Sequence, residues 1–411
     1  MVGGAYAATR AGRGLTLGQP GRADLDAAPI ARAYPGAGLV CQGRNAAAMF
    51  GAHCRRPRLW YAGPMRLLTP LPQDDLRDVP EAARAAEAAG YDGLTTAENK
   101  HDPFLALAVA GVASARIGLE TSVAIAFPRS PMVVANAAWD LHIASRGRFV
   151  LGLGPQIRPH NERRFSVPWS APAPRLRDYV ASLRAIWTAW ETGTKLAHEG
   201  PHYHFTLMPP YFVPPGLHLP MVPITLAAVG PHTLRLAGEV ADGVRLHGFC
   251  TRAYLDQEIL PRLAEGHARS GRARDAFQVI GGGFVATGAD DAAVARGVEV
   301  ARGRIAFYGS TPAYWPVLEL HGLGDLGRKL NAMTRAGQWA EMPREVSDEV
   351  VALFTAIGRH RDLPRAIAER FGPEIDALAL PAGLPPDLLA ELRALPSRFT
   401  GYRRPWPRGD A

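Results

Sequence analysis

One eight-residue stretch, AENKHDPF (97–104), concentrates side chains that can do acid–base chemistry. It brings Glu98, His101 and Asp102 together directly after an apolar run. A carboxylate and an imidazole this close in sequence can position a substrate hydroxyl and accept its proton near neutral pH. We favour such a role for Glu98 and His101. Asp102 stands immediately before a proline, which is typical of a residue that caps a helix.

A second candidate stretch runs from Ser145 to Phe165. Its apolar part, Phe149–Leu153, predicts a buried strand, and Gly152 and Gly154 interrupt it. The loop that follows is rich in polar side chains: Gln156, Arg158, His160, Asn161, Glu162, Arg163 and Arg164. Two interpretations stay open. The glycines admit a flat ligand or another backbone at close range, or they form a tight turn before an ordinary surface loop.

A third candidate is the turn at Gly230 and Pro231, which opens a predicted helix. The free N–H groups and the dipole of a helix N-terminus favour an anionic group such as phosphate, although such a turn alone is a weak motif. The sequence has no dinucleotide-binding glycine motif, no Walker lysine loop, no HExxH and no Gly-x-Ser-x-Gly. His202 and His204 alternate, but no third ligand is evident, so we predict no metal site.

Short apolar runs alternate with helical patterns over about 330 residues, which predicts parallel strands joined by helical crossovers. The eight expected strands are 66–69, 91–96, 117–127, 149–154, 224–228, 243–246, 277–287 and 375–380. The expected helices are 75–89, 103–115, 131–145, 173–193, 232–239, 252–270, 290–307, 346–357, 363–371 and 386–395. We expect a β-ribbon within 195–207, a proline-dense excursion over 209–223 and an irregular segment over 308–344. Eight units favour a closed (β/α)8 barrel, with an open doubly wound sheet as the alternative, and a barrel would gather these loops on one face.

Composition describes a globular chain that can bury a large core, with 411 residues, 47% apolar and 20% charged. The net charge of +8 comes mainly from eight arginines before residue 65, against only Asp24 and Asp26. The remaining 38 basic and 36 acidic residues nearly balance, so we expect no nucleic-acid partner. No apolar run approaches the roughly 18 residues of a membrane span. Three scattered cysteines suit a reducing compartment, and we expect a cytoplasmic protein without a membrane partner.

The chain divides into three parts by composition. Residues 1–64, rich in Ala, Gly, Pro and Arg, predict a disordered extension, and Met65 is a plausible biological start. A barrel is expected over 65–396, followed by a C-terminal tail over 397–411.

Taken together, five stretches resemble the luciferase-like superfamily of flavin and deazaflavin barrels, in particular its coenzyme F420-dependent oxidoreductase branch. The stretches are YDGLTTAENKHDPFLALAVA, IGLETSVAIAFPRSPMVVANAAWDL, SRGRFVLGLGPQIRPHNERRFSVPW, AAVGPHTLRLAGEVADGVRLHGF and IAFYGSTPAYWPVLELHG. The resemblance covers about Met65 to Leu395. It implies a (β/α)8 TIM barrel with insertions after strand four and before strands five and eight, coenzyme F420 as cofactor with FMN as the alternative, and a non-prolyl cis peptide near Ser122-Val123.

The resemblance also implies roles for particular residues. The phosphate-holding turn corresponds to Gly230 and Pro231. The family's acid/base pair is an acidic residue followed directly by His, whereas here Asn99 follows Glu98 and His101 comes two residues later. We take His101 and Glu98 as the catalytic candidates. The expected cofactor-binding residues are Ser122, Val123, Gly152, Gly154, Gln156, Ala228, Gly230, Pro231 and His247.

The implied reaction is hydride transfer between the deazaflavin and a small organic substrate, such as an alcohol, a carbonyl compound or an enone. An FMN-dependent monooxygenase and a cofactor-binding barrel without turnover are the alternatives. The insertions at 195–223 and 308–344 are expected to shape the substrate pocket or to form a dimer interface, and we expect a homodimer.

Overall fold

The computed structural model describes residues 63–402 and Trp406. Apart from Gly63 and Pro64, the expected N-terminal extension lies outside these residues, as do Cys41 and Cys54. None of the helices in the described part of the chain is long and apolar enough to cross a membrane.

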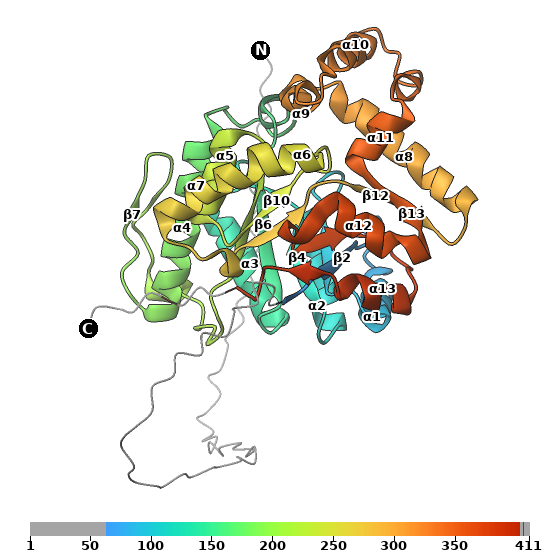
Figure 1. Cartoon of the computed structure of the whole chain (residues 1–411). Helices are drawn as coiled ribbons and strands as arrows, with labels where there is room; N and C mark the ends of the chain where they lie inside the picture. Colours follow the sequence, from blue (N-terminus) through green and yellow to red (C-terminus); the bar gives the residue numbers. More distant parts are fainter. Residues whose placement is uncertain (1–62, 403–405, 407–411) are drawn as a thin grey trace, which may run out of the picture. The chain divides into compact units, whose positions relative to one another are not determined.

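Eight parallel strands form a closed barrel that helices surround (Figure 1). The strands are β2 (Arg66–Pro70), β3 (Gly93–Thr96), β4 (Gly118–Thr121), β6 (Phe149–Gly154), β9 (Ile224–Ala228), β10 (Gly243–Leu246), β11 (Gln278–Gly281) and β14 (Ala377–Ala379). Pairing between β4 and β6 closes the sheet, where Leu119 lies opposite Phe149 and Glu120 opposite Val150. The expected closed barrel is confirmed, and the open-sheet alternative is wrong.

Helices follow the strands as expected. They are α1 (Val79–Ala89), α2 (Pro103–Ala113), α3 (Pro131–Ala144), α4 (Pro172–Thr192), α5 (Pro231–Val240), α6 (Arg252–Tyr254), α7 (Leu260–Ser270), α12 (Leu363–Phe371) and α13 (Pro386–Arg393). A π-helical turn, Leu255–Ile259, joins α6 to α7. Local sequence explains several ends: Asp102 caps α2 through the Phe104 N–H at 2.8 Å, and Gly90 ends α1 with a φ of 101°.

The expected strand 117–127 is broken in the structure. It forms β4 and a two-residue strand, β5 (Ala124–Ile125), which pairs with the end of β6. The Ser122-Val123 peptide bond between them is cis, as the resemblance implied.

The insertion between β6 and β9 contains α4 and an antiparallel ribbon of β7 (His198–Glu199) and β8 (His204–Phe205). The ribbon expected within 195–207 is therefore confirmed. The proline-dense segment after it has one short 3-10 turn, Pro210–Phe212.

The insertion between β11 and β14 differs most from expectation (Figure 1). The expected strand 277–287 ends at Gly281 and Gly282, whose φ angles of 81° and 105° turn the chain into β12 (Phe284–Gly288). β12 pairs with β13 (Thr355–Arg359), so the expected helix 346–357 is wrong beyond α11 (Asp348–Phe354). This pairing is tertiary and leaves no local signal in the sequence.

The segment 308–344, expected to be irregular, is mainly helical. It contains the end of α8 (Asp291–Gly309), then α9 (Trp315–Glu319), α10 (Gly324–Arg335) and a 3-10 turn, Met342–Glu345. Trp315 packs on Gly327, where a Cβ would lie 2.9 Å from the indole. This contact between α9 and α10 stabilises helices that their short, glycine-rich sequences alone do not predict.

A charged cluster fills the barrel interior. Glu120 is completely buried and pairs with Arg66 at 2.9 Å and with Arg245 at 2.5 Å, so it ties β4 to β2 and β10. Burial disfavours ionisation of Glu120, but the two guanidinium charges outweigh it and hold its pKa below the ordinary value. Tyr402, from the tail, donates to Gln278 beside this cluster.

The first residues of the tail also contact the barrel. β15 (Pro396–Ser397) pairs with β1 (Gly63–Pro64), and the Phe399 N–H donates to Asp376 at 3.0 Å. The described residues 397–402 therefore pack with the barrel. The expected domain boundary at residue 396 stays a prediction.

We predict that Glu120→Gln lowers the free energy of unfolding by about 3 kcal/mol or more, because the buried guanidinium of Arg245 and the partly buried one of Arg66 then have no carboxylate between them. Denaturant unfolding at pH 7 measures this loss. Because the pKa of Glu120 is lowered on folding, its contribution is complete above the ordinary carboxyl pKa and is lost as the pH falls below it. The gap between wild type and Glu120→Gln should therefore narrow under acid conditions.

The matched control is Glu299→Gln, which removes an exposed partner of Arg302 and should cost no more than about 1 kcal/mol. Equal losses from the two variants at pH 7 would contradict the importance of the interior cluster.

Candidate active site

The carboxyl ends of the barrel strands form one rim, because all eight strands are parallel. The loops after β3, β6, β9 and β10 start there, and they carry Glu98, Gln156, Gly230 and His247. Direct contacts connect neighbouring loops around this rim. Ile125 donates to Glu98 and pairs with Gly154, and a Cβ on Gly154 would lie 3.4 Å from Ala227.

Glu98 is buried and both of its carboxylate oxygens are occupied. Oε1 accepts from Arg129 at 2.8 Å, while Oε2 accepts from Arg129 and from the Ile125 N–H, each at 2.7 Å. Arg129 also donates to Asp102 at 2.9 Å. Burial alone would lower the pKa of Arg129, but the two carboxylates outweigh it and raise the pKa. Glu98 therefore fixes the segment after the cis peptide to the loop after β3.

His101 lies on the same loop but is largely exposed. Its Nε2 is 3.2 Å from Oδ1 of Asp74, which belongs to the loop after β2. The side chain of Asp74 is 91% exposed, so solvent reaches this pair. The arrangement can exchange a proton with a substrate, because the carboxylate orients the imidazole.

The two glycines of β6 accommodate protein atoms. A Cβ on Gly152 would lie 1.9 Å from the Thr121 carbonyl oxygen and 2.6 Å from Nε of Arg245. A Cβ on Gly154 would lie 2.7 Å from Val123, in the cis peptide segment. Of the two interpretations left open, close approach by another backbone explains Gly152. Gly154 gives room to the cis segment at the rim.

The turn at Gly230 leaves open space. Gly230 precedes α5, no side chain caps this helix, and a Cβ on Gly230 would meet nothing within 4 Å. Pro231 has no N–H, so His232 and Thr233 present the first N–H groups of the helix. These features suit a bound phosphate group. Ala228, at the end of β9, is buried beside Leu246 in the register of the sheet.

His247 follows β10 and lies between two tyrosines from the second insertion. Its ring stacks on Tyr314 with centroids 4.6 Å apart and meets Tyr308 edge-on at 4.3 Å. Burial lowers the pKa of His247 to about 4, so the imidazole is neutral at pH 7. The Phe249 N–H donates to Nδ1 at 3.0 Å, which places the imidazole proton on Nε2. His247 can therefore donate one hydrogen bond from Nε2.

Gln156 has a left-handed backbone with a φ of 59°, and its Oε1 accepts from the Ile157 N–H at 2.9 Å. Beyond it, a π-helical turn, His160–Arg164, carries Arg164, which donates to the Asn99 carbonyl. This bond connects the loop after β6 to the loop that holds Glu98 and His101.

Sequence reasoning missed Arg129, and it named Arg164 in the polar loop without expecting its bond to Asn99. From the sequence, no role was assigned to the residues after the third strand, whereas Arg129 pairs with Glu98 there. Phe127, two residues earlier, is buried beneath Arg175. The available signal for Arg129 was a single charged residue in the apolar stretch AIAFPRSP.

Comparison with known proteins identifies the class. The model of the luciferase-like monooxygenase family matches residues 58–376, and the chain belongs to this family. An uncharacterized protein of Mycobacterium tuberculosis is 44% identical over 324 residues, which are 79% of this chain and 94% of that protein.

Two further relatives have a stated activity. The 5,10-methylenetetrahydromethanopterin reductase of Archaeoglobus fulgidus is 28% identical, over 70% of this chain and 83% of that protein. The solved coenzyme F420-dependent tetrahydromethanopterin reductase of Methanopyrus kandleri has a TM-score of 0.66 at 18% identity, covering 81% of this chain and 97% of that one. The latter likeness shows the luciferase-like barrel fold. Members of this family are oxidoreductases and monooxygenases, which makes this chain an enzyme of that broad class.

Proposed function

We propose that this protein is a coenzyme F420-dependent oxidoreductase that transfers a hydride between the deazaflavin and a small organic substrate, such as an alcohol, a carbonyl compound or an enone. The observation that carries the proposal is that the segment after β4, the uncapped N-terminus of α5 and His247 share one barrel rim. The name of the Methanopyrus kandleri reductase, which states its dependence on coenzyme F420, supports F420 over FMN.

The residues at the rim fit such a cofactor. Gly230, Pro231 and the N-terminus of α5 would hold its phosphate. The segment Ser122-Val123, Gly154 and Ala228 would lie against its ring system. Gln156 and His247 would line the pocket. Gly152 would not contact the cofactor but would support the pocket floor by packing closely on Thr121. When bound, the deazaflavin supplies the hydride chemistry at its C5 position.

The protein's own residues would then orient the substrate and move a proton. His101, supported by Asp74, takes or gives the proton of the substrate oxygen. Glu98 acts through Arg129 and Ile125 as a positioning residue, because its carboxylate is fully bonded within the protein. The proposed proton transfer therefore depends on His101, because Asn99 stands where family members commonly have histidine.

We predict that the purified protein binds F420 more tightly than FMN and that Gly230→Asp weakens F420 binding at least tenfold. The new carboxylate would cap α5, take its free N–H groups and repel the phosphate. Gly230→Ala is the matched control, because its methyl group meets open space and φ is −84°. Fluorescence titration measures both affinities.

The same titration separates the alternatives. Tight FMN binding without F420 binding would favour a monooxygenase, which the family name also covers. F420 binding without turnover of any alcohol, carbonyl compound or enone would favour a catalytically silent barrel. Failure to bind either cofactor would refute the proposal.

We predict that His101→Ala reduces turnover by on the order of a hundredfold or more while F420 affinity is retained, because only proton transfer is lost. Asp74→Asn should give a smaller loss of turnover, because the imidazole is then less firmly oriented. His360→Ala, which removes a histidine far along the chain from the rim loops, controls for loss of an imidazole. Unchanged steady-state kinetics of His101→Ala would reject its role.

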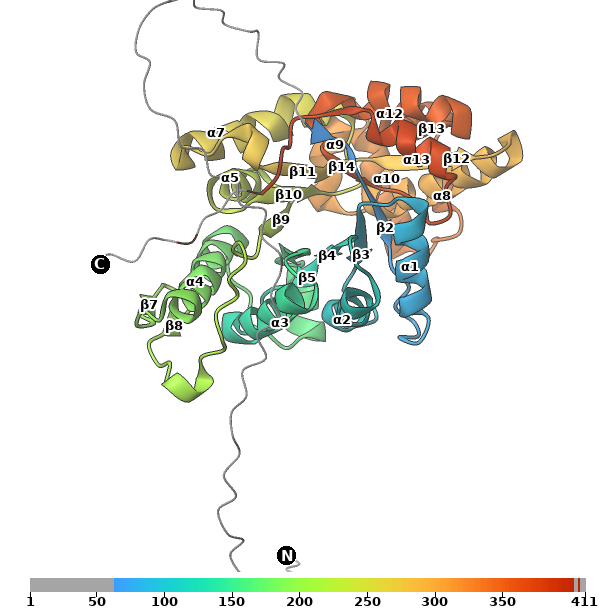
Figure 2. The same cartoon turned by 90° about the horizontal axis from the view of Figure 1, so that it is seen from below.

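We also propose that the protein is a homodimer through α2 and α3. These helices pack side by side on one flank of the barrel (Figure 2). Each exposes large apolar side chains, with 57% of Leu105, 75% of Val112, 58% of Val133 and 47% of Ile143 accessible. The helix α2, PFLALAVAGVA, is apolar on every side, which is typical of a helix buried on both faces. We propose that the same face of a second copy of the chain covers these side chains.

We predict that light scattering gives twice the mass of one chain for the wild type and that Val112→Glu shifts the protein to monomers, because burying an unpaired carboxylate is costly. Val300→Glu places the same charge on exposed α8 and should leave the dimer intact. A wild-type monomer at micromolar concentration would contradict the proposal.

A further inference from the structure

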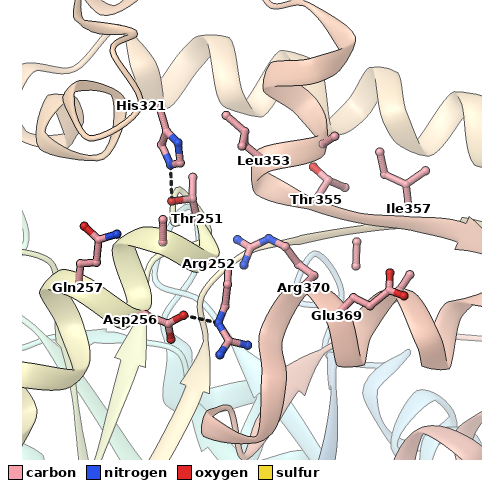
Figure 3. A pocket seen from close by; sticks show the side chains of 14 residues that line it. Thr251, Arg252, Asp256, Gln257, His321, Leu353, Thr355, Ile357, Glu369 and Arg370 are labelled. Atoms are coloured by element: carbon pink, nitrogen blue, oxygen red, sulfur yellow. Dashed lines mark hydrogen bonds and ion pairs between the residues drawn. The ribbon is translucent and has the colours of Figure 1, made fainter.

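A cavity of about 750 Å³ lies outside the barrel, between α6, α12 and the second insertion (Figure 3). One wall carries polar side chains, among them Thr251, Arg252 and Arg370. The opposite wall, from α11 and β13, carries small and apolar residues: Ala352, Leu353, Ala356 and Ile357. Ala366, on α12 with Arg370, also lines the cavity. Its size is in the range of small-molecule sites.

Arg370 is the unusual member of this lining, because it is 92% buried without a carboxylate partner. Its exposed fraction is 8%, and no ion pair joins it to any acid within the described residues. Nη2 donates to the carbonyl oxygens of Cys250 and Gly282, while Nε and Nη1 have no acceptor. A buried guanidinium normally has an anionic partner, since carbonyl groups alone compensate its desolvation poorly.

The other charged groups of the cavity do not supply that partner. Arg252 pairs with Asp256 at 2.6 Å, and Glu369 pairs with Arg365 at 3.1 Å. Figure 3 shows Arg370 reaching from α12 toward Thr251, with the carboxylate of Glu369 pointing away from it. Burial, together with the like charge of Arg252, lowers the pKa of Arg370 to about 10, so it stays protonated at neutral pH. The cavity therefore carries a positive charge that two carbonyl groups and the Phe371 ring, 5.0 Å away, stabilise but that no anion among the described residues pairs with.

We propose that this cavity binds a small organic anion, with its carboxylate or phosphate group at Arg370 and its hydrocarbon part on the apolar wall. In the proposed complex the anionic group would meet Nε and Nη1 of Arg370, which have no acceptor, and the half-exposed side chain of Arg252, paired with Asp256, would move to admit it. Thr251 lines the same wall but is buried, and its hydroxyl is engaged, since it bonds His321 at 2.8 Å and accepts from the Tyr254 N–H at 3.2 Å. Charge pairing and apolar burial then act together. The charge alone would bind inorganic phosphate equally well, and the apolar wall alone would bind an alcohol equally well.

The site is separate from the barrel rim but shares a loop with it. Residues 247–251 begin at His247, on the rim, and end at Thr251, in the cavity. Arg370 holds the carbonyl group of Cys250 within this loop. An anion that draws Arg370 away from Cys250 would loosen the loop that orients His247, so occupancy of the cavity would reach the rim.

Isothermal titration of the cofactor-free protein tests the site with hexanoate, hexyl phosphate, inorganic phosphate and hexanol. We expect hexanoate or hexyl phosphate to bind at least tenfold more tightly than inorganic phosphate or hexanol, and the tighter of the two identifies the anionic group. Ala366→Glu, which adds a carboxylate to the cavity, should weaken this binding at least tenfold. Ala368→Glu makes the same change on an exposed position of α12 and should leave the affinity unchanged.

Arg370→Gln provides the second arm, because its amide can still donate to Cys250 while the charge is removed. If this variant retains the wild-type circular dichroism, it should lose the preference for hexanoate over hexanol. If it unfolds, the paired Ala366→Glu and Ala368→Glu variants decide. No binding of either organic anion at millimolar concentration, or equal affinity of the two glutamate variants, would overturn the proposal. The test needs no cofactor, so its failure is independent of the proposed reaction.

Discussion

The hydrogen bonds between β4 and β6 are the constraint on which the rest of the structure depends. They close a sheet whose strands are all parallel, so every strand delivers its following loop to the same rim. An open sheet of the same strands would separate the loop after β3 from the loops after β9 and β10. Closure instead places Glu98, Gly230 and His247 around one opening, and any joint chemistry of these loops requires it.

Three buried charges show how this fold handles desolvation. Glu120 compensates two arginines inside the barrel, and Arg129 compensates Glu98 beneath the rim. Both arrangements connect segments that are distant in sequence, and both leave the charges with bonded partners. Arg370 differs, because carbonyl oxygens are its acceptors within the described residues. Glu120 and Glu98 thus have ionic partners within the protein, whereas in our proposal the anionic partner of Arg370 is a ligand.

The second insertion links these features. Its tyrosines, Tyr308 and Tyr314, enclose His247 and keep the imidazole neutral by burial. Its strand β13 and helix α11 form the apolar wall of the lateral cavity. One excursion thus borders both the rim and the outer cavity, while the barrel beneath it keeps the family architecture. Sequence changes in this insertion would alter both the rim near His247 and the lateral cavity without affecting the closure of the barrel.

Apolar periodicity, proline and glycine are local signals, so the barrel, most helix ends and the order of the rim loops were predictable from the residues alone. Asp102 as a cap and the ribbon within 195–207 are examples. The pairing of β12 with β13 and the ion pair between Arg129 and Glu98 are evident only in the folded chain. The partners lie 71 residues apart in the first case and 31 in the second, and no sequence pattern links them. The tertiary structure likewise decided that Thr121 and Arg245 crowd Gly152, because close packing across strands depends on closure rather than on neighbouring residues.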